Sequence, residues 1–154
     1  MNAELLTTND LDPSPLRETE LVEEIQFLTA RLAAKGNSYA NKLLEDVELN
    51  VRQFSVLALA ASSLKPTQRE MSAFVALDPS QIVALVDMLE DRGLVKRETD
   101  PNDRRSKNIV ATTAGQKLYR QAREITIAAE DHVLAKLSET ERDQLRELLT
   151  KAAL

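Results

Sequence analysis

Two helix-start signals lie close together in the middle of the chain, and they constrain the fold more than any other feature. Thr67-Gln-Arg-Glu70 fits the S/T-x-x-E capping box, in which the two terminal side chains bond to each other's backbone N–H groups. Asp78-Pro-Ser-Gln81 places an acid at the cap and a proline at the first helical position. This spacing predicts a short helix, a tight turn and a second helix.

The second helix carries an apolar stripe, and the periodicity changes after it. The stripe follows the i, i+3, i+4, i+7 pattern of a helix face and consists of Ile82, Leu85, Val86 and Leu89. Gly93 is expected to end this helix. Residues 94–98 and 109–111 then predict the two strands of a hairpin, whose loop of roughly ten residues exceeds the usual hairpin length. Helix, turn, helix and hairpin together predict a winged helix-turn-helix.

The net charge of −5 conceals an uneven distribution. Residues 65–123 carry 11 Lys or Arg and 8 Asp or Glu, whereas the rest of the chain carries 9 and 17. A basic middle between acidic ends is typical of a protein that presents one positive face to nucleic acid. Chance clustering is the alternative that charge alone leaves open.

Residue types that are absent or rare exclude several kinds of site. The chain has no cysteine, which excludes disulfides, thiolate catalysis and cysteine metal sites. Its single histidine, His132, excludes a multi-histidine metal centre. Since no nucleophile–base pair or glycine-rich phosphate loop is present, we expect no enzyme activity, metal or cofactor. There is no signal peptide pattern and no apolar run of the ~20 residues that span a bilayer, so the expected location is the cytoplasm.

The two helices and the hairpin supply the residues expected to contact double-stranded DNA. A recognition helix reads base edges in the major groove with its first residues. The preceding helix contacts phosphates, and an arginine on the hairpin enters the narrow minor groove. The expected contacts are Thr67, Gln68 and Arg69 on the first helix, Pro79, Ser80, Gln81, Val83 and Ala84 on the second, and Arg97, Asp103, Arg104, Arg105 and Lys107 on the hairpin.

Some of these residues have specific expected roles. Gln81 is suited to pair with adenine, while Val83 and Ala84 are suited to meet thymine methyl groups. The alternative for Val83 and Ala84 is a place in the core. The N–H groups at the start of the second helix are expected to face a phosphate. Asp103 is expected to pair with Arg105 and hold it extended, and the alternative for this loop is an ordinary solvated turn.

Three consecutive motifs closely resemble the MarR family of bacterial transcription regulators. They are Leu85-Val-Asp-Met-Leu-Glu-Asp-Arg-Gly-Leu-Val-Lys-Arg97, Asp100-Pro-Asn-Asp-Arg-Arg-Ser106 and Thr112-Thr-Ala-Gly115. The resemblance implies that Arg105 enters the minor groove and that Asp103 orients it. This chain departs from the family pattern at Ala111, where leucine is common, and at the start of the recognition helix, which leaves the operator sequence open.

Helical segments flank the winged helix and complete the expected domain organisation. Residues 1–16 are expected to form a flexible arm, 17–49 and 114–154 dimerisation helices, and 50–113 the DNA-binding lobe. The fold is expected to be mainly α, with about six helices and a two- to three-stranded wing sheet. Gly36 is expected to weaken the first long helix, and Thr113 and Ser138 fit capping boxes that open the last two helices.

The resemblance also implies a homodimer and a small effector. The apolar residues expected at the dimer interface are Leu21, Ile25, Leu28, Leu32, Val133, Leu137, Leu145, Leu148 and Leu149. The candidates for binding an aromatic or anionic effector are Arg31, Tyr39, Phe54 and His132, for each of which a core or surface role is the alternative. The expected function is a repressor that binds a pseudo-palindromic operator. The alternative is a winged helix that binds another protein and not DNA.

Overall fold

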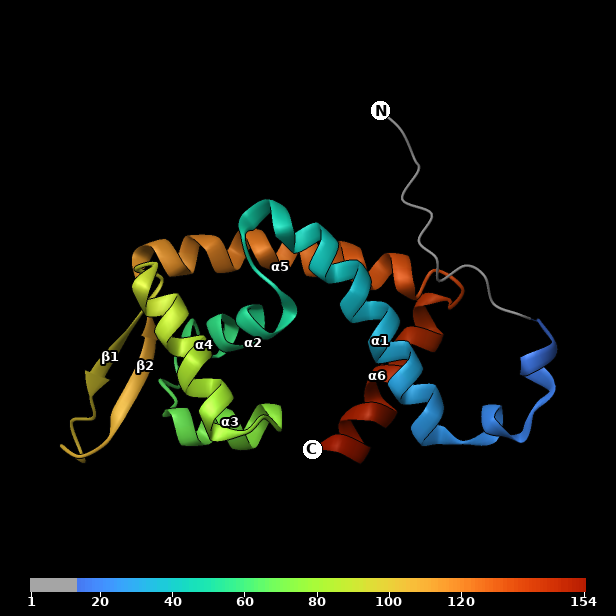
Figure 1. The fold of residues 1–154 in the computed structure, drawn as a ribbon, viewed down its shortest axis with the longest axis horizontal. Helices are drawn as coiled ribbons and strands as arrows, with labels where there is room; N and C mark the ends of the chain where they lie inside the picture. The colour runs from blue at the N-terminus through green and yellow to red at the C-terminus, as the bar shows by residue number, and fades with distance from the viewer. Residues whose placement is uncertain (1–13) are drawn as a thin grey trace. The chain divides into compact units, whose positions relative to one another are not determined.

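The computed structural model describes residues 14–154, and these residues form six α-helices, three 3₁₀ helices and a two-stranded antiparallel sheet (Figure 1). The expected mainly α winged helix-turn-helix is confirmed. An arm is expected over residues 1–16, and residues 1–13 of it lie outside the part of the chain that the structure describes. The elements are η1 (Ser14–Glu18), η2 (Glu20–Glu23), α1 (Ile25–Leu44), η3 (Glu45–Val47), α2 (Val51–Ala60), α3 (Gln68–Val75), α4 (Pro79–Asp91), β1 (Val95–Thr99), β2 (Lys107–Ala111), α5 (Thr113–Val133) and α6 (Glu139–Ala153).

Residue contacts divide the chain into two compact units. One unit comprises Ala40–His132 and contains the end of α1, η3, α2, α3, α4, the hairpin and α5 except its last residue. The other unit contains residues 14–39 together with Val133–Leu154. The lobe expected over residues 50–113 therefore falls inside the first unit, which we call the lobe from here on.

The core of the lobe forms where α2, α3, α4 and the hairpin meet. The apolar stripe of α4 points inward as the sequence predicts, and each of its four residues is buried. Residues from the other elements complete the cluster: Leu44, Val47, Leu49, Val56, Leu57, Ala60, Met71, Leu94, Val95, Ile109 and Ala122. Burial of this apolar surface is the main force that fixes α3 and α4 relative to the hairpin.

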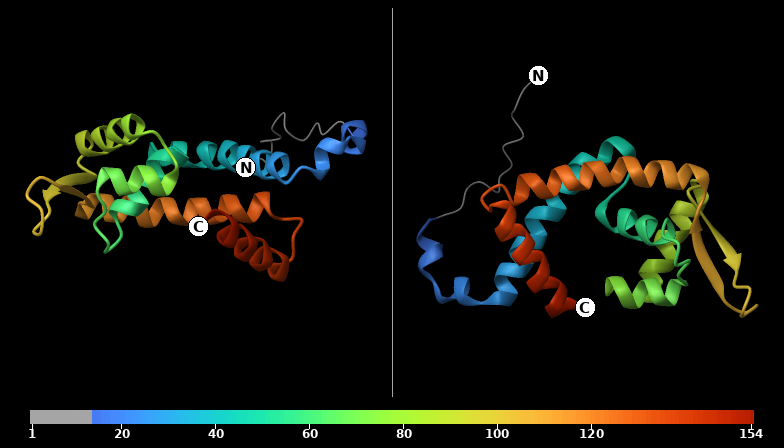
Figure 2. Two further views of the ribbon diagram at one scale, coloured as in Figure 1. Left: turned by 90° about the horizontal axis from the view of Figure 1, so that it is seen from below. Right: turned by 180° about the vertical axis from the view of Figure 1, so that it is seen from behind.

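The hairpin is longer in its strands and shorter in its loop than the sequence predicts. Its register runs from Val95 opposite Ala111 to Thr99 opposite Lys107, so only residues 100–106 lie between the strands. A single bridge joins Thr67 to Asn108, which adds one rung of a third strand to the sheet. Both views in Figure 2 show the hairpin extending beyond α3 and α4 at the edge of the lobe.

Two helices, α1 and α5, differ from the sequence predictions. α1 runs without a break through Gly36, where an added Cβ would meet no neighbouring atom within 4 Å. α5 is capped by Thr112 and not by Thr113, because the Thr112 hydroxyl accepts the N–H of Gly115 at 3.1 Å. The Gln116 amide, expected to complete a capping box, instead donates to the carbonyl of Ala61 at 3.0 Å.

Among residues 14–154, no single helix is both long and apolar enough to cross a membrane. The bent pair α3 and α4 meets that test together, by length and composition only.

Candidate nucleic-acid interface

The first turn of α4 is exposed and tightly capped. The carboxylate of Asp78 accepts the backbone N–H of Ser80 at 2.8 Å and its hydroxyl at 2.5 Å. Both bonds lower the pKa of Asp78, and the bond from the Ser80 hydroxyl has the larger effect. The carboxylate that caps α4 therefore stays ionised. The N–H of Gln81 bonds to the Asp78 carbonyl at 3.0 Å. The N–H groups expected to face a phosphate are therefore already bonded within the turn.

Side chains at the start of α4 present a surface of about two turns. Pro79, Ser80 and Gln81 are exposed, as are Val83 and Ala84. Val83 is 42% exposed, so its outward orientation is as predicted. Because the buried stripe occupies the opposite face, this surface is free to enter a groove about the width of a helix.

The start of α3 offers less to a ligand than the sequence predicts. The Thr67 hydroxyl accepts the N–H of Glu70 at 3.2 Å and donates to its carboxylate at 2.8 Å, which completes the predicted capping box. The side-chain oxygen of Gln68 accepts a bond from Arg97 at 3.0 Å. Arg69 is exposed, and within residues 14–154 no hydrogen bond or ion pair engages its guanidinium. Arg69 is thus the residue of this set best placed to reach a phosphate.

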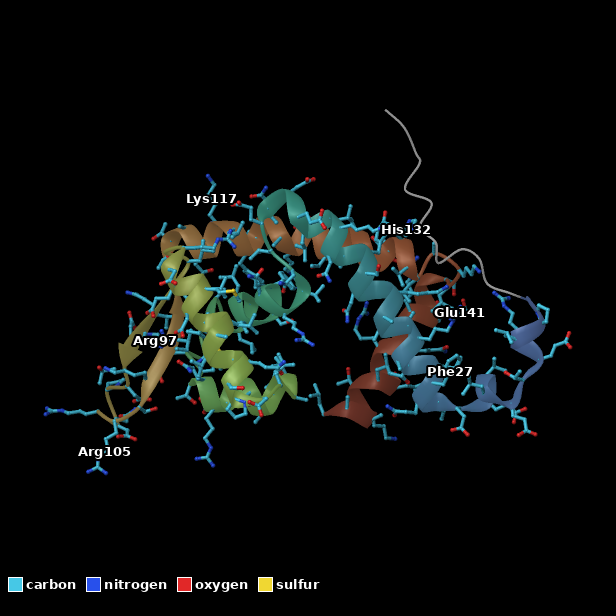
Figure 3. The ribbon with its side chains drawn as sticks, viewed as in Figure 1. Phe27, Arg97, Arg105, Lys117, His132 and Glu141 are labelled. Atoms are coloured by element: carbon cyan, nitrogen blue, oxygen red, sulfur yellow. The ribbon has the colours of Figure 1, made fainter. Side chains whose placement is uncertain are left out.

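The hairpin loop presents two arginines to solvent. Arg104 and Arg105 are exposed at the tip, and Figure 3 shows the side chain of Arg105 pointing away from the rest of the lobe. The Asp103 carboxylate accepts the backbone N–H of Arg105 at 2.9 Å, in place of the expected pairing with its guanidinium. This bond belongs to an Asx-type turn, which shapes the loop backbone. Asp103 therefore acts on the path of the chain through the tip.

Further bonds fix the loop from its base. Asp100 accepts the N–H of Asn102 at 2.7 Å, and its own N–H donates to the carbonyl of Ser106 at 3.1 Å. The bond from Asn102 is the main cause that lowers the pKa of Asp100. Lys107, expected in the loop, lies on β2, and its ammonium donates to the Thr99 hydroxyl at 2.7 Å. The base of the loop is thus closed by one backbone bond and one side-chain bond.

Arg97 differs most from its predicted role. Its guanidinium points toward α4, where it pairs with Asp87 at 2.5 Å and with Glu90. Burial lowers the pKa of Arg97, but the hydrogen bond to Asp87 and the charge of Glu90 outweigh burial and raise it overall. Only 25% of its side chain is exposed. The expected DNA contact is therefore an internal link, and Figure 3 places Arg97 between the hairpin and α4.

Sequence reasoning missed the acidic half of this link. Asp87 and Glu90 lie three residues apart on α4, so they share a face of the helix. Acidic residues on the outer face of a helix expected to meet DNA are themselves a signal, because they oppose binding unless a cation neutralises them. That signal, together with a basic strand directly after the helix, would have identified the pair.

The four effector candidates belong to different units. Arg31 and Tyr39 lie in the unit that contains α6, whereas Phe54 and His132 lie in the lobe. Phe54 stacks on Tyr119 with ring centroids 6.0 Å apart and packs against the core. Phe54 therefore has the core role that was the alternative to effector binding. Within residues 14–154, no group of three or more His, Asp or Glu side chains is arranged to hold a metal ion.

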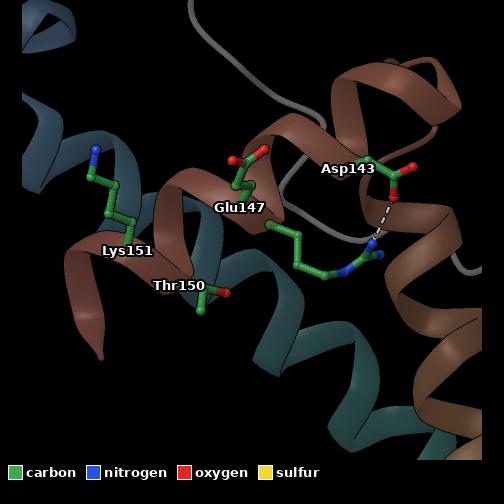
Figure 4. A pocket seen from close by; sticks show the side chains of 5 residues that line it. Asp143, Glu147, Thr150 and Lys151 are labelled. Carbon is green, nitrogen blue, oxygen red and sulfur yellow. Dashed lines mark hydrogen bonds and ion pairs between the residues drawn. The ribbon is translucent and has the colours of Figure 1, made fainter.

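A shallow hollow along α6 does not resemble a ligand site. It is lined by Asp143, Arg146, Glu147, Thr150 and Lys151, all from one face of that helix (Figure 4). Asp143 and Arg146 form an ion pair at 2.7 Å, and more than 60% of each side chain is exposed. Such an exposed pair contributes little free energy. The hollow is a solvated charged face.

Sequence and structure comparisons agree on the relatives of this chain. The sequence model of the MarR family matches residues 49–107. The HTH-type transcriptional regulator PecS of Dickeya dadantii is 30% identical over 151 residues, which cover 91% of this chain and 82% of PecS. CouR of Rhodococcus jostii RHA1, in a crystal structure with p-coumaroyl-CoA, is 41% identical with a TM-score of 0.79, over 87% of this chain and 94% of CouR.

A second solved structure contains nucleic acid. It is a transcriptional repressor also named CouR, bound to a 23-mer DNA duplex. That repressor is 29% identical to this chain and has a TM-score of 0.78, over 88% of this chain and 96% of its own. The similarity therefore covers most of the chain.

Proposed function

This chain belongs to the MarR family of transcriptional regulators, and we propose that it is a sequence-specific DNA-binding repressor. The observation that supports this proposal best is the common exposure of two surfaces on one lobe. The first turns of α4 are solvent-exposed, and Arg105 extends from the tip of the adjoining hairpin. A helix for the major groove and a cation for the minor groove are the two readers that this mode of binding requires.

The proposed DNA contacts follow from which side chains the lobe leaves available. On α4 they are Pro79, Ser80, Gln81, Val83 and Ala84. Arg69 and the loop arginines 104 and 105 add positive charge for phosphates and for the minor groove. The remaining candidates, Thr67, Gln68, Arg97, Asp103 and Lys107, are bonded within the lobe, and we propose that they shape the surface.

We propose that the functional form is a homodimer. α6 has no buried residue in this chain, and Leu148 is 65% exposed on it. Leu21, Ile25 and Leu28 are also exposed in the same unit. Several large apolar side chains exposed in one unit are typical of an interface. A two-fold dimer would bind a pseudo-palindromic operator whose half-sites are about one helical turn apart.

The relative that has a bound ligand supports a proposal for the chemistry of an effector. p-Coumaroyl-CoA combines an aromatic acyl group with anionic phosphates, which matches the aromatic or anionic effector expected from the sequence. We propose an effector of this class. Titration of p-coumaroyl-CoA into the protein–DNA complex should release DNA, while free coenzyme A serves as the control for the phosphates alone.

Selection of bound fragments from random and genomic DNA tests the main proposal. We expect a recovered motif with two-fold symmetry, and an affinity whose logarithm falls linearly with the logarithm of salt concentration. Recovery of no sequence above background would contradict DNA recognition and favour the protein-binding alternative. A recovered motif without symmetry would support DNA binding but contradict the proposed dimer. A regulator of chromosomal DNA would act in the cytoplasm, and no enzymatic role is proposed.

A further inference from the structure

Arg97 lies where three elements of the lobe meet, and its side chain joins all three. It belongs to β1, its Nε donates to Gln68 of α3, and its two Nη atoms donate to Asp87 and Glu90 of α4. Its backbone N–H donates to a Glu90 carboxylate oxygen at 3.2 Å. A planar guanidinium that stays charged at every relevant pH suits this fork, whereas a lysine ammonium presents a single point of charge.

Arg97 lies in the middle of β1, between the start of the strand and the hairpin tip. At the root of the strand, the N–H of Leu94 bonds to the Leu89 carbonyl at 2.9 Å, and Val95 is buried in the core. Further along, Glu98 pairs with Lys96 on its own strand. Within residues 14–154, no side chain of β1 beyond Arg97 bonds to α4. Arg97 is therefore the outermost side-chain link between α4 and the hairpin, whereas the bridge from Thr67 to Asn108 joins the hairpin to the start of α3.

We propose that Arg97 is a positioning residue that sets the angle between the hairpin and α4, so that Gln81 and Arg105 engage neighbouring grooves of one duplex together. This inference rests on the proposed function. The geometry of B-form DNA fixes the separation of its grooves. Two readers held rigidly at that separation lose less conformational freedom on binding than two that move independently.

The charges of Asp87 and Glu90 separate this proposal from simple electrostatics. Both carboxylates lie on the helix expected to face the DNA polyanion, so removal of either charge would strengthen DNA binding if charge alone mattered. If the carboxylates hold Arg97 in place, the same removal frees the hairpin and weakens binding. The two explanations therefore predict opposite signs for Glu90→Ala.

The first test measures the angle without DNA. Because the chain has no cysteine, Ala84→Cys on α4 and Asn102→Cys in the hairpin loop introduce two spin labels with no background. The labelled protein is diluted into excess unlabelled protein, so that each measured pair comes from one chain. We expect a narrow distance distribution that Arg97→Lys and Glu90→Ala broaden and that Lys96→Ala leaves unchanged. An equally narrow distribution in Arg97→Lys would overturn the proposal.

The second test measures affinity for the operator recovered by fragment selection. We expect Arg97→Lys and Glu90→Ala each to weaken binding about tenfold, as residues coupled through one network do, with no change in the salt slope. Lys96→Ala is the matched control for a lost charge on the same strand. If Arg97 bound a phosphate directly, Arg97→Lys would retain affinity and Arg97→Ala would lower the slope by about one, and the proposal would fail.

The two tests also distinguish this inference from the proposed function. If the wild-type protein bound no DNA, the proposed function would fail, while the distance measurement would still decide whether Arg97 sets the angle. Thermal unfolding of each variant confirms that it is folded. Tighter DNA binding by Glu90→Ala would overturn the inference and leave DNA recognition intact.

Discussion

The backbone carbonyl oxygen of Leu94 lies against the α-carbon of Gly115, so that a Cβ built on Gly115 would sit 1.9 Å from it. Thr112 tightens the same junction, because its hydroxyl donates to the Gly93 carbonyl at 2.6 Å and accepts the Gly115 N–H. The first turn of α5 is therefore held directly against the start of β1. The base of the hairpin is thus fixed by contacts that do not involve Arg97.

Gly115→Ala should destabilise the lobe by about 2 kcal/mol or more, because the added methyl group overlaps backbone atoms that cannot rotate away. Alanine favours a helix over glycine by about 1 kcal/mol, so the overlap must outweigh this gain. Gly36→Ala is the matched control, since a Cβ there meets no atom within 4 Å, and it should stabilise the protein. Denaturant unfolding measures both variants. Equal stability of Gly115→Ala and wild type would contradict the contact.

Ala76→Gly should stabilise the protein by about 0.5–1 kcal/mol, because Ala76 ends α3 in the left-handed conformation with φ of 53°. Glycine adopts this conformation without the strain that a Cβ causes. Ala73→Gly, three residues earlier on the exposed side of the same helix, should instead destabilise by about 1 kcal/mol. Melting temperatures that move in the same direction for the two variants would rule out strain at Ala76.

Acidification should weaken the cap of α3. The bonds from the Thr67 backbone N–H and hydroxyl lower the pKa of Glu70 below its usual 4.5. A lowered folded-state pKa means that this contribution to stability is present above pH 4.5 and is lost as pH falls through the folded-state value. Glu70→Gln keeps an oxygen acceptor but does not titrate. The stability difference between wild type and this variant should therefore be constant above about pH 5 and shift against wild type below it. A constant difference at every pH would exclude the linkage.

Local signals in the sequence predicted several helix starts because capping is a local interaction. Thr67, Asp78 and Ser138 each cap the helix that their spacing predicts. The start of α5 was predicted one residue late, at Thr113. The hydroxyl of Thr112, which caps this helix instead, bonds to the carbonyls of Gly93 and Leu94, and no local pattern contains these contacts.

The sequence predicted which elements form the candidate site but not what each of its side chains contacts. Composition and order place basic residues on the strand after the recognition helix, and Arg97 was accordingly assigned to DNA. The acidic residues on α4 indicate that a cation neutralises them, but which basic residue reaches Asp87 and Glu90 depends on where the strand leaves the helix. The exposure of Arg104 and Arg105 was easier to predict, because a loop that projects from the lobe leaves long cationic side chains few internal partners.

Gln81→Ala should relax base preference more than it reduces non-specific binding. Gln81 is exposed on the first turn of α4, and a bidentate contact with a base contributes about 1–3 kcal/mol of discrimination. The measurement compares the selected operator, operators with single base changes and unrelated DNA. Gln121→Ala, on the exposed surface of α5, controls for loss of an amide elsewhere. An equal loss on all sequences would show that Gln81 does not read a base.

Arg105→Ala should weaken operator binding by about 1–3 kcal/mol while the protein stays folded. The guanidinium extends from the hairpin tip into solvent, and within residues 14–154 no hydrogen bond or ion pair holds it, so its removal costs the fold nothing. Lys117→Ala is the matched control, because it removes the same charge from the exposed surface of α5, away from the hairpin tip (Figure 3). Fluorescence anisotropy at several salt concentrations separates a specific contact from general attraction. Equal losses of operator affinity in the two variants would show that Arg105 contributes only general positive charge. Unchanged affinity in Arg105→Ala would show that the hairpin tip does not contact DNA.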